Sequence, residues 1–393
     1  MIIDIPARAF YSLFMIYSVP KLERADVAVI QLIEQQKQRL RIFTQNNPNR
    51  WMGSLRRSTF ARAMVGSNSI EGYHATVGDA IAVVQNEEAL DAKGETLAAL
   101  QGYRDAMTYI IQAANDPHFE FATQFLKSLQ FMMLRHDLTK NPGQWRPGAI
   151  FVVDQATGKT VYEAPDADQV NGLVEELVAF LRSDNGTPPL VRAAMAHLNL
   201  TMIHPFKDGN GRMARALQTL VLALEGVIYP LFSSIEEWLG NHTPEYYKIL
   251  ADTGQGQWNP TQDALPWVRF CLTAHYQQSA TLIRRNEEYA RLYDRIVILV
   301  AEARLPDRVT LPVFDAALGW AITNPRYRTD AEVGEYMATR DLKALCDAGL
   351  FEPIGEKRGR HYKRTGVLEK LRNEVRIHKP VENPYHLIAS SEV

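Results

Sequence analysis

The stretch His204–Arg215 reads His-Pro-Phe-Lys-Asp-Gly-Asn-Gly-Arg-Met-Ala-Arg and lies between two apolar segments. Residues 190–203 before it have helical spacing, and Pro205 disfavours helical backbone at His204, so we expect a helix to end there. Residues 213–224 after it again have helical spacing and end near Gly226. The local structure predicted is a helix, a short loop and a second helix.

The start of the second helix has the features of an anion site. A helix N-terminus carries unpaired N–H groups and the positive end of the helix dipole, which attract anions. Gly209 and Gly211 allow the backbone to come close to such an anion. Arg212 and Arg215 are three residues apart on the second helix, so both guanidinium groups can hold phosphate oxygens. The pattern indicates a polyphosphate.

The other polar residues of this stretch supply chemistry for a phosphate-containing substrate. Asp208 can hold Mg2+ against the phosphates, because hard cations take oxygen ligands. His204 has an ordinary pKa near neutrality and is the candidate general base for an attacking hydroxyl. Asn210 can donate or accept, so its role stays open, and we also count Lys207 among the nucleotide-binding candidates. A lone histidine before a proline is usually a loop or core residue, so the prediction depends on the whole constellation.

These residues resemble the signature of the Fic family, His-Pro-Phe-x-Asp/Glu-Gly-Asn-Gly-Arg with a second arginine three residues later. The resemblance implies a mainly α fold, a Fic-type helical bundle with a β-hairpin flap, that moves AMP from ATP onto a Ser, Thr or Tyr hydroxyl of a target protein. It assigns the base to His204 and the Mg2+ ligand to Asp208. It assigns the nucleotide phosphates to the backbone of Gly209 and Gly211 and to Asn210, Arg212 and Arg215.

The same resemblance leaves other activities open. A kinase branch of the family carries Lys at the position of Gly211 and binds the nucleotide in reverse, so Gly211 favours transfer of AMP. Removal of AMP from a modified target, or use of another nucleotide, stays possible with the same site. A DNA-binding regulator with a vestigial core is a further alternative, although such a core would be expected to lose part of the motif.

A second motif, Ser67-Asn-Ser-Ile-Glu71-Gly72, resembles the family's inhibitory sequence Ser/Thr-x-x-x-Glu-Gly/Asn. The resemblance implies that Glu71 pairs with Arg215 and occupies the place of the ATP γ-phosphate. A carboxylate and a phosphate can compete for one guanidinium group. A short helix that ends at Gly72 would explain the same string without any inhibition, but the core motif downstream favours a self-restrained enzyme.

The composition sets limits on the class of protein. The chain has 393 residues, of which 22% are charged and 46% hydrophobic, and a formal net charge of −2, which argues against a general affinity for nucleic acid. Cys271 and Cys346 form no disulfide framework and no metal-binding spacing, which suits a reducing, cytoplasmic location. Residues 10–19 are too few to span a bilayer, so we expect no signal peptide and no membrane anchor.

The rest of the chain divides into predicted domains. Residues 1–54 form an N-terminal helical segment, residues 55–300 the Fic domain with its inhibitory helix, residues 301–380 a winged-helix-like domain and residues 381–393 a tail. Residues 149–153 and 159–163 alternate like strands around a Gly-containing turn at 155–158. The family resemblance makes this hairpin the flap that docks an extended target segment by strand addition, although a hairpin that only covers the core is the plainer alternative.

Two further features complete the expectations. Tyr246 and Tyr247, followed by Gly254 and Trp258, resemble the family region that lines the adenine pocket. Predicted helices over 311–322 and 329–348, followed by a basic turn at 356–362, resemble a winged helix. Its wing could contact DNA, but target selection or self-association fits better, because the segment before the recognition helix is short for a helix-turn-helix.

Overall fold

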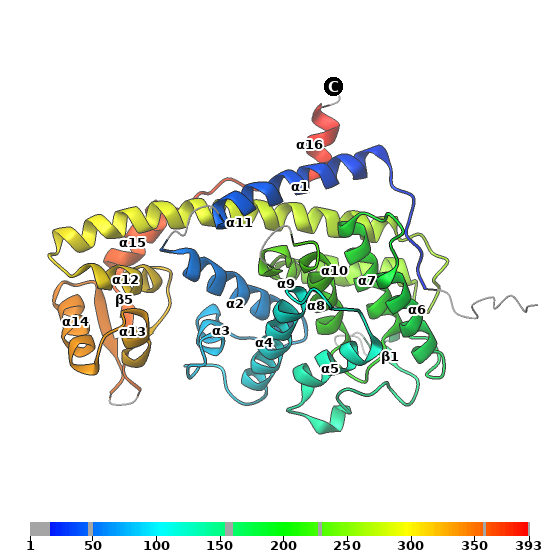
Figure 1. Cartoon of the computed structure of the whole chain (residues 1–393), viewed down its shortest axis with the longest axis horizontal. Helices are drawn as coiled ribbons and strands as arrows, with labels where there is room; N and C mark the ends of the chain where they lie inside the picture. Colours follow the sequence, from blue (N-terminus) through cyan, green and yellow to red (C-terminus); the bar gives the residue numbers. More distant parts are fainter. Residues whose placement is uncertain (1–15, 46–49, 154–159, 227–229, 357–358, 392–393) are drawn as a thin grey trace, which may run out of the picture.

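The computed structural model describes residues 16–45, 50–153, 160–226, 230–356 and 359–391 (Figure 1). Its α-helices are α1 (Arg24–Gln45), α2 (Met52–Ile70), α3 (Val77–Val84), α4 (Gly94–Ala114), α5 (Thr123–Leu134), α6 (Val170–Arg182), α7 (Pro189–Ile203), α8 (Asn210–Ala223), α9 (Glu236–Asn241), α10 (Thr243–Gly254), α11 (Leu265–Glu302), α12 (Thr310–Ala317), α13 (Asn324–Asp330), α14 (Glu335–Asp347), α15 (Gly366–Glu374) and α16 (Pro384–Ser391). The 3-10 helices are η1 (Leu138–Lys140), η2 (Pro230–Ser233) and η3 (Asp307–Val309), and the strands are β1 (Phe151–Val153), β2 (Thr160–Glu163), β3 (Ile322–Thr323), β4 (Phe351–Ile354) and β5 (His361–Arg364). The fold is therefore mainly α, as predicted.

The longest helix, α11, connects the two ends of the molecule (Figure 1). Helix α1 lies along it, and α16 packs against both helices. Arg269 on α11 joins this layer by donating to the buried carboxylate of Asp26 on α1, with 2.8 Å between Nε and Oδ1. Tyr385 on α16 donates to the same oxygen at 2.9 Å. Segments from both ends of the chain are thus held on one face of α11.

Helices α7 and α8 pack against each other at the centre of the helical bundle. Almost every residue of both helices is buried, including polar ones such as His197, Asn199 and Gln218. A helix buried on every side belongs in the interior of a bundle. The loop between α7 and α8, which carries the motif, therefore has a rigid support on both sides.

Strands β1 and β2 form the predicted antiparallel hairpin, in which Val152 lies opposite Tyr162. Its expected turn, residues 155–158, lies outside the described residues. The outer edge of β2 is covered, because the N–H of Glu163 donates to Gly256 O at 2.9 Å and its carbonyl accepts from Trp258 N at 3.0 Å. Tyr162 ties the hairpin to α7 by donating its hydroxyl hydrogen to Met202 O at 2.8 Å.

The C-terminal unit contains a small antiparallel sheet in the order β3-β5-β4, packed with helices α12 to α15. Two details of the sequence prediction were wrong here. The expected helix over 311–322 ends at Ala317, and Ile322 instead begins β3, because Gly319 has a positive φ of 96° that interrupts the helix. The expected helix over 329–348 is divided into α13 and α14, which meet near Glu332 with a φ of 53°.

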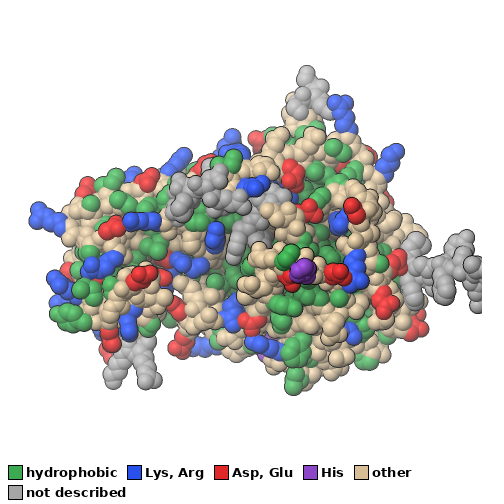
Figure 2. Space-filling model, viewed as in Figure 1, with side chains coloured by type: hydrophobic (Ala, Val, Ile, Leu, Met, Phe, Trp, Pro, Cys, Tyr) green, Lys and Arg blue, Asp and Glu red, His purple; other side chains and the backbone are tan. Residues whose placement is uncertain are grey.

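The element order of this unit is α12, β3, α13, α14, β4 and β5, and the winged-helix assignment stays a prediction. Part of the expected wing, Lys357 and Arg358, lies outside the described residues. Figure 2 shows Lys and Arg side chains mixed with Asp and Glu on the described surface of this unit, at the left of the view. DNA binding stays an untested prediction. Among the described residues, no helix has the length and apolar character needed to cross a bilayer.

Candidate functional site

The loop between α7 and α8 is fixed by backbone conformation and by one side chain. His204 adopts a left-handed conformation with a φ of 51°, and its N–H donates to Leu200 O at 3.1 Å, so α7 ends there as expected from Pro205. Gly209, with a φ of 80°, is the N-cap residue directly before α8. The second helix therefore starts at Asn210. The sequence had predicted a later start, at residue 213.

Asn210 closes this loop. Its side-chain oxygen accepts from Phe206 N at 2.9 Å, and its side-chain nitrogen donates to Phe206 O at 2.9 Å. Both polar atoms of the buried amide are thus used within the loop. The role left open by the sequence is a structural one in this conformation: Asn210 shapes the loop that presents the neighbouring backbone.

The imidazole of His204 is held in a form suited to a base. Its Nδ1 lies 3.1 Å from Thr201 O, and because a carbonyl can only accept, Nδ1 carries the hydrogen. Burial lowers the pKa of His204 below its ordinary value, so the ring is neutral at pH 7. Its Nε2 consequently keeps a lone pair that can accept a proton.

Sequence reasoning missed Arg146, which binds the backbone carbonyl groups of this loop. It is 3% exposed, and its Nε donates to His204 O at 2.9 Å while its Nη1 donates to Gly148 O at 2.7 Å. Its own N–H donates to Pro205 O at 2.9 Å. Arg146 therefore fixes the backbone of the base relative to the start of the hairpin. No motif in the sequence singles out this arginine.

Arg212 is the strongest sign of an anionic ligand. Its side chain is 1% exposed, yet none of its three guanidinium nitrogens has a hydrogen-bond partner among the described residues. Its nearest carboxylate oxygen, Asp208 Oδ1, is 3.8 Å away, and the ring of Tyr73 lies 5.3 Å from its central carbon. A buried guanidinium group without partners costs several kcal/mol, on the order of 3, unless a ligand satisfies it.

Arg215, one helical turn further on, is occupied by the upstream motif. Its Nη2 donates to Glu71 Oε1 at 2.7 Å and to Ser67 O at 2.9 Å, and its Nε donates to Ser67 Oγ at 2.8 Å. The predicted pairing of Glu71 with Arg215 is therefore present in the structure. One nitrogen, Nη1, is buried and has no partner among the described residues.

Gly211 lies under this ion pair. A Cβ on Gly211 would overlap Oε1 of Glu71 and would lie 3.0 Å from Nη1 of Arg215. Because Gly211 has no side chain, the Glu71 carboxylate can occupy this space. A phosphate oxygen could occupy the same space if Glu71 moved away.

Helix α2, which carries Ser67 and ends next to Glu71, is itself pinned in position. It crosses α9 so closely that a Cβ on Gly66 would overlap the backbone of Glu236. Tyr247 donates its hydroxyl hydrogen to Ile70 O at 2.9 Å. These contacts fix the position of α2 relative to α9 and α10.

Asp208 and Lys207 lie at the outer side of the loop. Asp208 Oδ1 accepts from Gly209 N at 2.6 Å, and its Oδ2 lies 3.3 Å from Lys140 Nζ. Lys207 is exposed and donates to Thr139 O at 2.9 Å. Asp208 is partly exposed and its Oδ1 lies 3.8 Å from Nη2 of Arg212, so its carboxylate can reach a cation bound to phosphates there. The described residues contain no group of three or more His, Cys, Asp and Glu side chains that could hold a metal ion.

The two candidate adenine-binding tyrosines differ in their surroundings. Tyr246 is 1% exposed, and its hydroxyl lies 2.9 Å from Nε2 of His197 in the core. Tyr247 is 49% exposed and contacts α2. Of the two, Tyr247 is therefore the one that a nucleotide can reach in this conformation.

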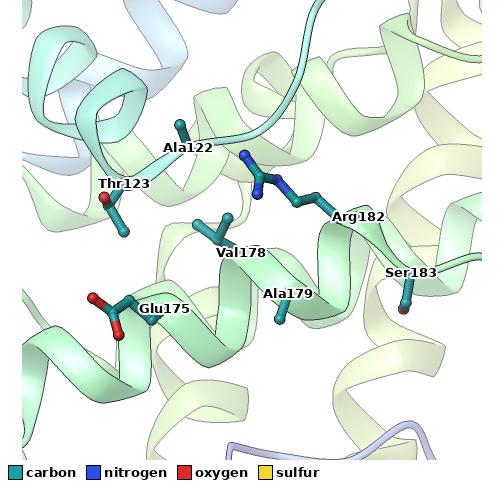
Figure 3. Close-up of a pocket in the computed structure, with 7 residues that line it drawn as sticks. All are labelled: Ala122, Thr123, Glu175, Val178, Ala179, Arg182 and Ser183. Carbon is teal, nitrogen blue, oxygen red and sulfur yellow. The ribbon is translucent and has the colours of Figure 1, made fainter.

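A cavity of about 540 Å³ lies elsewhere, between the start of α5 and one face of α6 (Figure 3). In Figure 3, Val178 lies between the side chains of Glu175 and Arg182. Arg182 donates to Phe121 O at 2.6 Å, so its guanidinium group is already engaged. This cavity contains no residue of either motif, and we do not assign the nucleotide to it.

Comparisons with known proteins agree with this geometry. Residues 119–222 match the Fic/DOC family. The protein adenylyltransferase Fic of Nematostella vectensis is 25% identical over 257 residues, which are 64% of this chain and 55% of that protein. The protein adenylyltransferase fic-1 of Caenorhabditis briggsae is 26% identical over 222 residues, 54% of this chain and 39% of that protein. The chain thus spans about half the length, or less, of these curated relatives.

Solved structures show the same fold. A Fic family protein from Desulfovibrio desulfuricans aligns with a TM-score of 0.58 and 21% identity, covering 89% of this chain and 99% of that one. A Fic domain-containing signaling protein from Bacteroides thetaiotaomicron aligns with a TM-score of 0.54 and 21% identity, covering 66% of this chain and 96% of that one. The helical core around α7 and α8 is therefore a Fic-type fold.

Proposed function

We propose that this chain, in which residues 119–222 form a domain of the Fic/DOC family, is a protein adenylyltransferase that moves AMP from ATP onto a hydroxyl side chain of a target protein. The observation that carries the proposal is the buried guanidinium group of Arg212, whose three nitrogens have no hydrogen-bond partner among the described residues and which lies in the same loop region as the neutral imidazole of His204. Curated relatives are named protein adenylyltransferases, which supports the same reaction.

In this reaction the phosphates of ATP bind at the start of α8. The Arg212 guanidinium group gains the hydrogen-bond acceptors that the described residues do not supply, and the backbone at Gly209 and Gly211 admits the phosphate chain. Asp208 is the residue that would hold Mg2+, since this ion is usually bound by one or two carboxylates together with nucleotide phosphates. The ion would neutralise phosphate charge and orient the leaving pyrophosphate.

The chemical step uses His204 as the base. The target hydroxyl oxygen attacks the α-phosphorus, and its proton passes to Nε2 of His204. The bond between the α-phosphorus and the bridging oxygen breaks, so pyrophosphate leaves with the electron pair and AMP remains on the hydroxyl oxygen. Thr201 holds the opposite ring nitrogen, and Arg146 holds the backbone of His204, so the base stays in one orientation.

The target segment docks against the hairpin. Gln257 and its neighbours already cover the outer edge of β2, whereas no strand among the described residues pairs with the outer edge of β1. Phe151 on β1 is 51% exposed, so an extended peptide can add to this edge and place its hydroxyl towards the motif loop.

The resting enzyme is restrained by Glu71. Its carboxylate occupies Arg215, which would otherwise hold a terminal phosphate of ATP. Removal of AMP from a modified target is the second candidate activity. It is favoured by one observation: the charge of the Glu71 carboxylate raises the pKa of the His204 ring, although burial, which lowers this pKa, dominates.

Labelled ATP provides the test of the transferase. With the label on the α-phosphate, wild-type protein should label a target or itself, and with the label on the γ-phosphate it should not. His204→Ala should abolish the α-label, while His118→Ala, which changes an exposed histidine outside both motifs, should retain it. Label from the γ-phosphate, or full activity of His204→Ala, would refute the proposal, and mass spectrometry would identify the modified hydroxyl.

A further inference from the structure

A second basic site lies away from the motif loop, where α2, α11 and the segment after α15 meet. This pocket has a volume of about 380 Å³. Its lining contains six Lys and Arg residues, which are Arg62, Arg284, Arg285, Arg372, Arg376 and Lys379. Glu288 is the carboxylate of the lining, so positive charge is in excess.

The carboxylates near the pocket do not cancel this charge. Glu237 is shared, because it lies 2.6 Å from Arg285 Nη2 and 3.5 Å from Arg62 Nη1. Glu288 accepts from Arg372 Nη2 at 2.8 Å and from Ile377 N at 2.9 Å. Two carboxylates thus face six cations, and both are already engaged.

Several donors are left for a ligand. Nη1 of Arg372 is buried and has no hydrogen-bond partner among the described residues. Arg376 is exposed at the rim. Burial and the neighbouring Arg285 lower the pKa of Arg62, although Glu237 acts in the opposite direction, so like charges crowd together here. A buried donor without a partner together with crowded cations indicates an anionic ligand.

We propose that this pocket is a second anion site and that it binds a small molecule with two or more phosphate groups. Several guanidinium groups facing one pocket of this size fit clustered phosphate oxygens, because each planar group donates two parallel hydrogen bonds. The pocket shares no residue with the motif loop, so the proposal does not depend on the AMP transfer proposed above.

Such a ligand would contact the restraint helix. Arg62 lies on α2, nine residues before Glu71 and about 14 Å along the helix axis. Arg372 and Arg376 belong to the C-terminal unit and its following segment. A bound polyphosphate therefore joins the C-terminal unit to the helix whose end blocks Arg215.

Calorimetry with sodium tripolyphosphate on the full chain tests the site. The pocket variant Arg376→Gln with Lys379→Gln changes two exposed residues and should preserve the fold. Its matched control, Lys363→Gln with Lys370→Gln, removes the same charge from exposed positions of the same unit outside the pocket. Arg212→Gln, introduced into each protein, removes binding at the motif loop.

The Arg212→Gln protein should still bind tripolyphosphate. In this background, the affinity should fall at least about tenfold in the pocket variant, because each lost charge-assisted contact is worth about tenfold or more in affinity. In the control variant, the affinity should change by less than about twofold. Equal binding by pocket variant and control would overturn the proposal. So would loss of all binding in Arg212→Gln alone. Binding to vesicles with phosphorylated inositol headgroups but not to free tripolyphosphate would replace the small molecule by a membrane lipid.

Discussion

Oε1 of Glu71 lies 2.7 Å from Nη2 of Arg215, although the two residues are 144 positions apart in the sequence. The guanidinium group is 1% exposed and the carboxylate 23% exposed. The pair is therefore accessible from the carboxylate side only, and a phosphate that reaches Arg215 has to displace Glu71. Under the proposed function, Glu71 and a phosphate of ATP therefore compete for the guanidinium group of Arg215.

The first prediction concerns this competition. We expect Glu71→Gly to increase transfer of the α-label by about tenfold to a hundredfold, which corresponds to the loss of one charge-assisted hydrogen bond worth about 1.5–3 kcal/mol. Glu71→Gln, which keeps the shape and loses the charge, should give an intermediate rate. Glu88→Gly, at an exposed position nearby in the chain, should leave the rate unchanged. Equal rates for wild type and Glu71→Gly would exclude restraint by this residue.

The second prediction concerns the space above Gly211. A Cβ there would overlap Oε1 of Glu71, so we expect Gly211→Ala to lower the free energy of unfolding by about 1–3 kcal/mol. In a Glu71→Gly background the cost should fall below about 1 kcal/mol, because only Arg215 Nη1 at 3.0 Å remains in the way. Denaturant unfolding of the four proteins measures this coupling. Additive effects would show that the carboxylate is not what Gly211 accommodates.

The third prediction concerns the other end of the restraint helix. Arg57 on α2 lies 3.0 Å from Oδ2 of Asp315, which is fully buried in α12 of the C-terminal unit, and Ser54 donates to Oδ1 of the same carboxylate at 2.6 Å. Helix α2 is thus held by the C-terminal unit at its start and by Arg215 at its end. We expect Arg57→Ala to release the start of α2 and to raise α-label transfer about two- to fivefold, on the order of 0.4–1 kcal/mol.

The same substitution in Glu71→Gly should have no further effect on transfer, since the carboxylate that α2 positions is gone. Lys93→Ala, at an exposed position before α4 with no side-chain cap hydrogen bond, serves as the control in both backgrounds. A similar increase from Arg57→Ala with and without Glu71 would mean that the C-terminal unit acts on the active site by another path.

How much of this site follows from sequence depends on the range of each interaction. The end of α7 was predictable because Pro205 acts on its own neighbourhood, whereas α8 begins three residues before the predicted position 213. The pairing of Glu71 with Arg215 was reached through the family resemblance, because no local pattern links residues so far apart. Arg146 was missed altogether: its role rests on carbonyl groups of the loop and the hairpin, and any residue can supply a carbonyl.

The C-terminal unit shows a different limit. The sequence predicted continuous helices at 311–322 and 329–348, since apolar residues there repeat at helical spacing. The helix ends are decided by Gly319 and Glu332, which take positive φ values. A glycine is a recognisable signal for such a turn, whereas Glu332 is not, because a glutamate adopts this conformation only when the surrounding structure requires it.

The last prediction concerns acid stability. His197 and His275 are buried and connected through Gln218, with 2.5 Å between His197 Nδ1 and Gln218 Oε1 and 2.9 Å between Gln218 Nε2 and His275 Nε2. Burial lowers the pKa of each ring to about 3. Their stabilising contribution is therefore complete above about pH 6.5, where the unfolded rings are also neutral, and falls as the pH drops from there towards 3.

At pH 5 each ring should cost about 2 kcal/mol of unfolding free energy relative to pH 8. Glu236 works in the opposite sense, because burial raises its pKa to about 7 and the unfolded carboxyl loses its proton near 4.5, so its contribution is lost as the pH rises. Comparison of wild type with His275→Gln cancels that effect. We expect the loss between pH 8 and pH 5, measured by urea unfolding, to be about 2 kcal/mol smaller in the variant. An equal loss in both proteins would mean that His275 is also protonated in the folded protein at pH 5. The assignment of neutral rings to the hydrogen-bonded chain His197–Gln218–His275 would then be wrong.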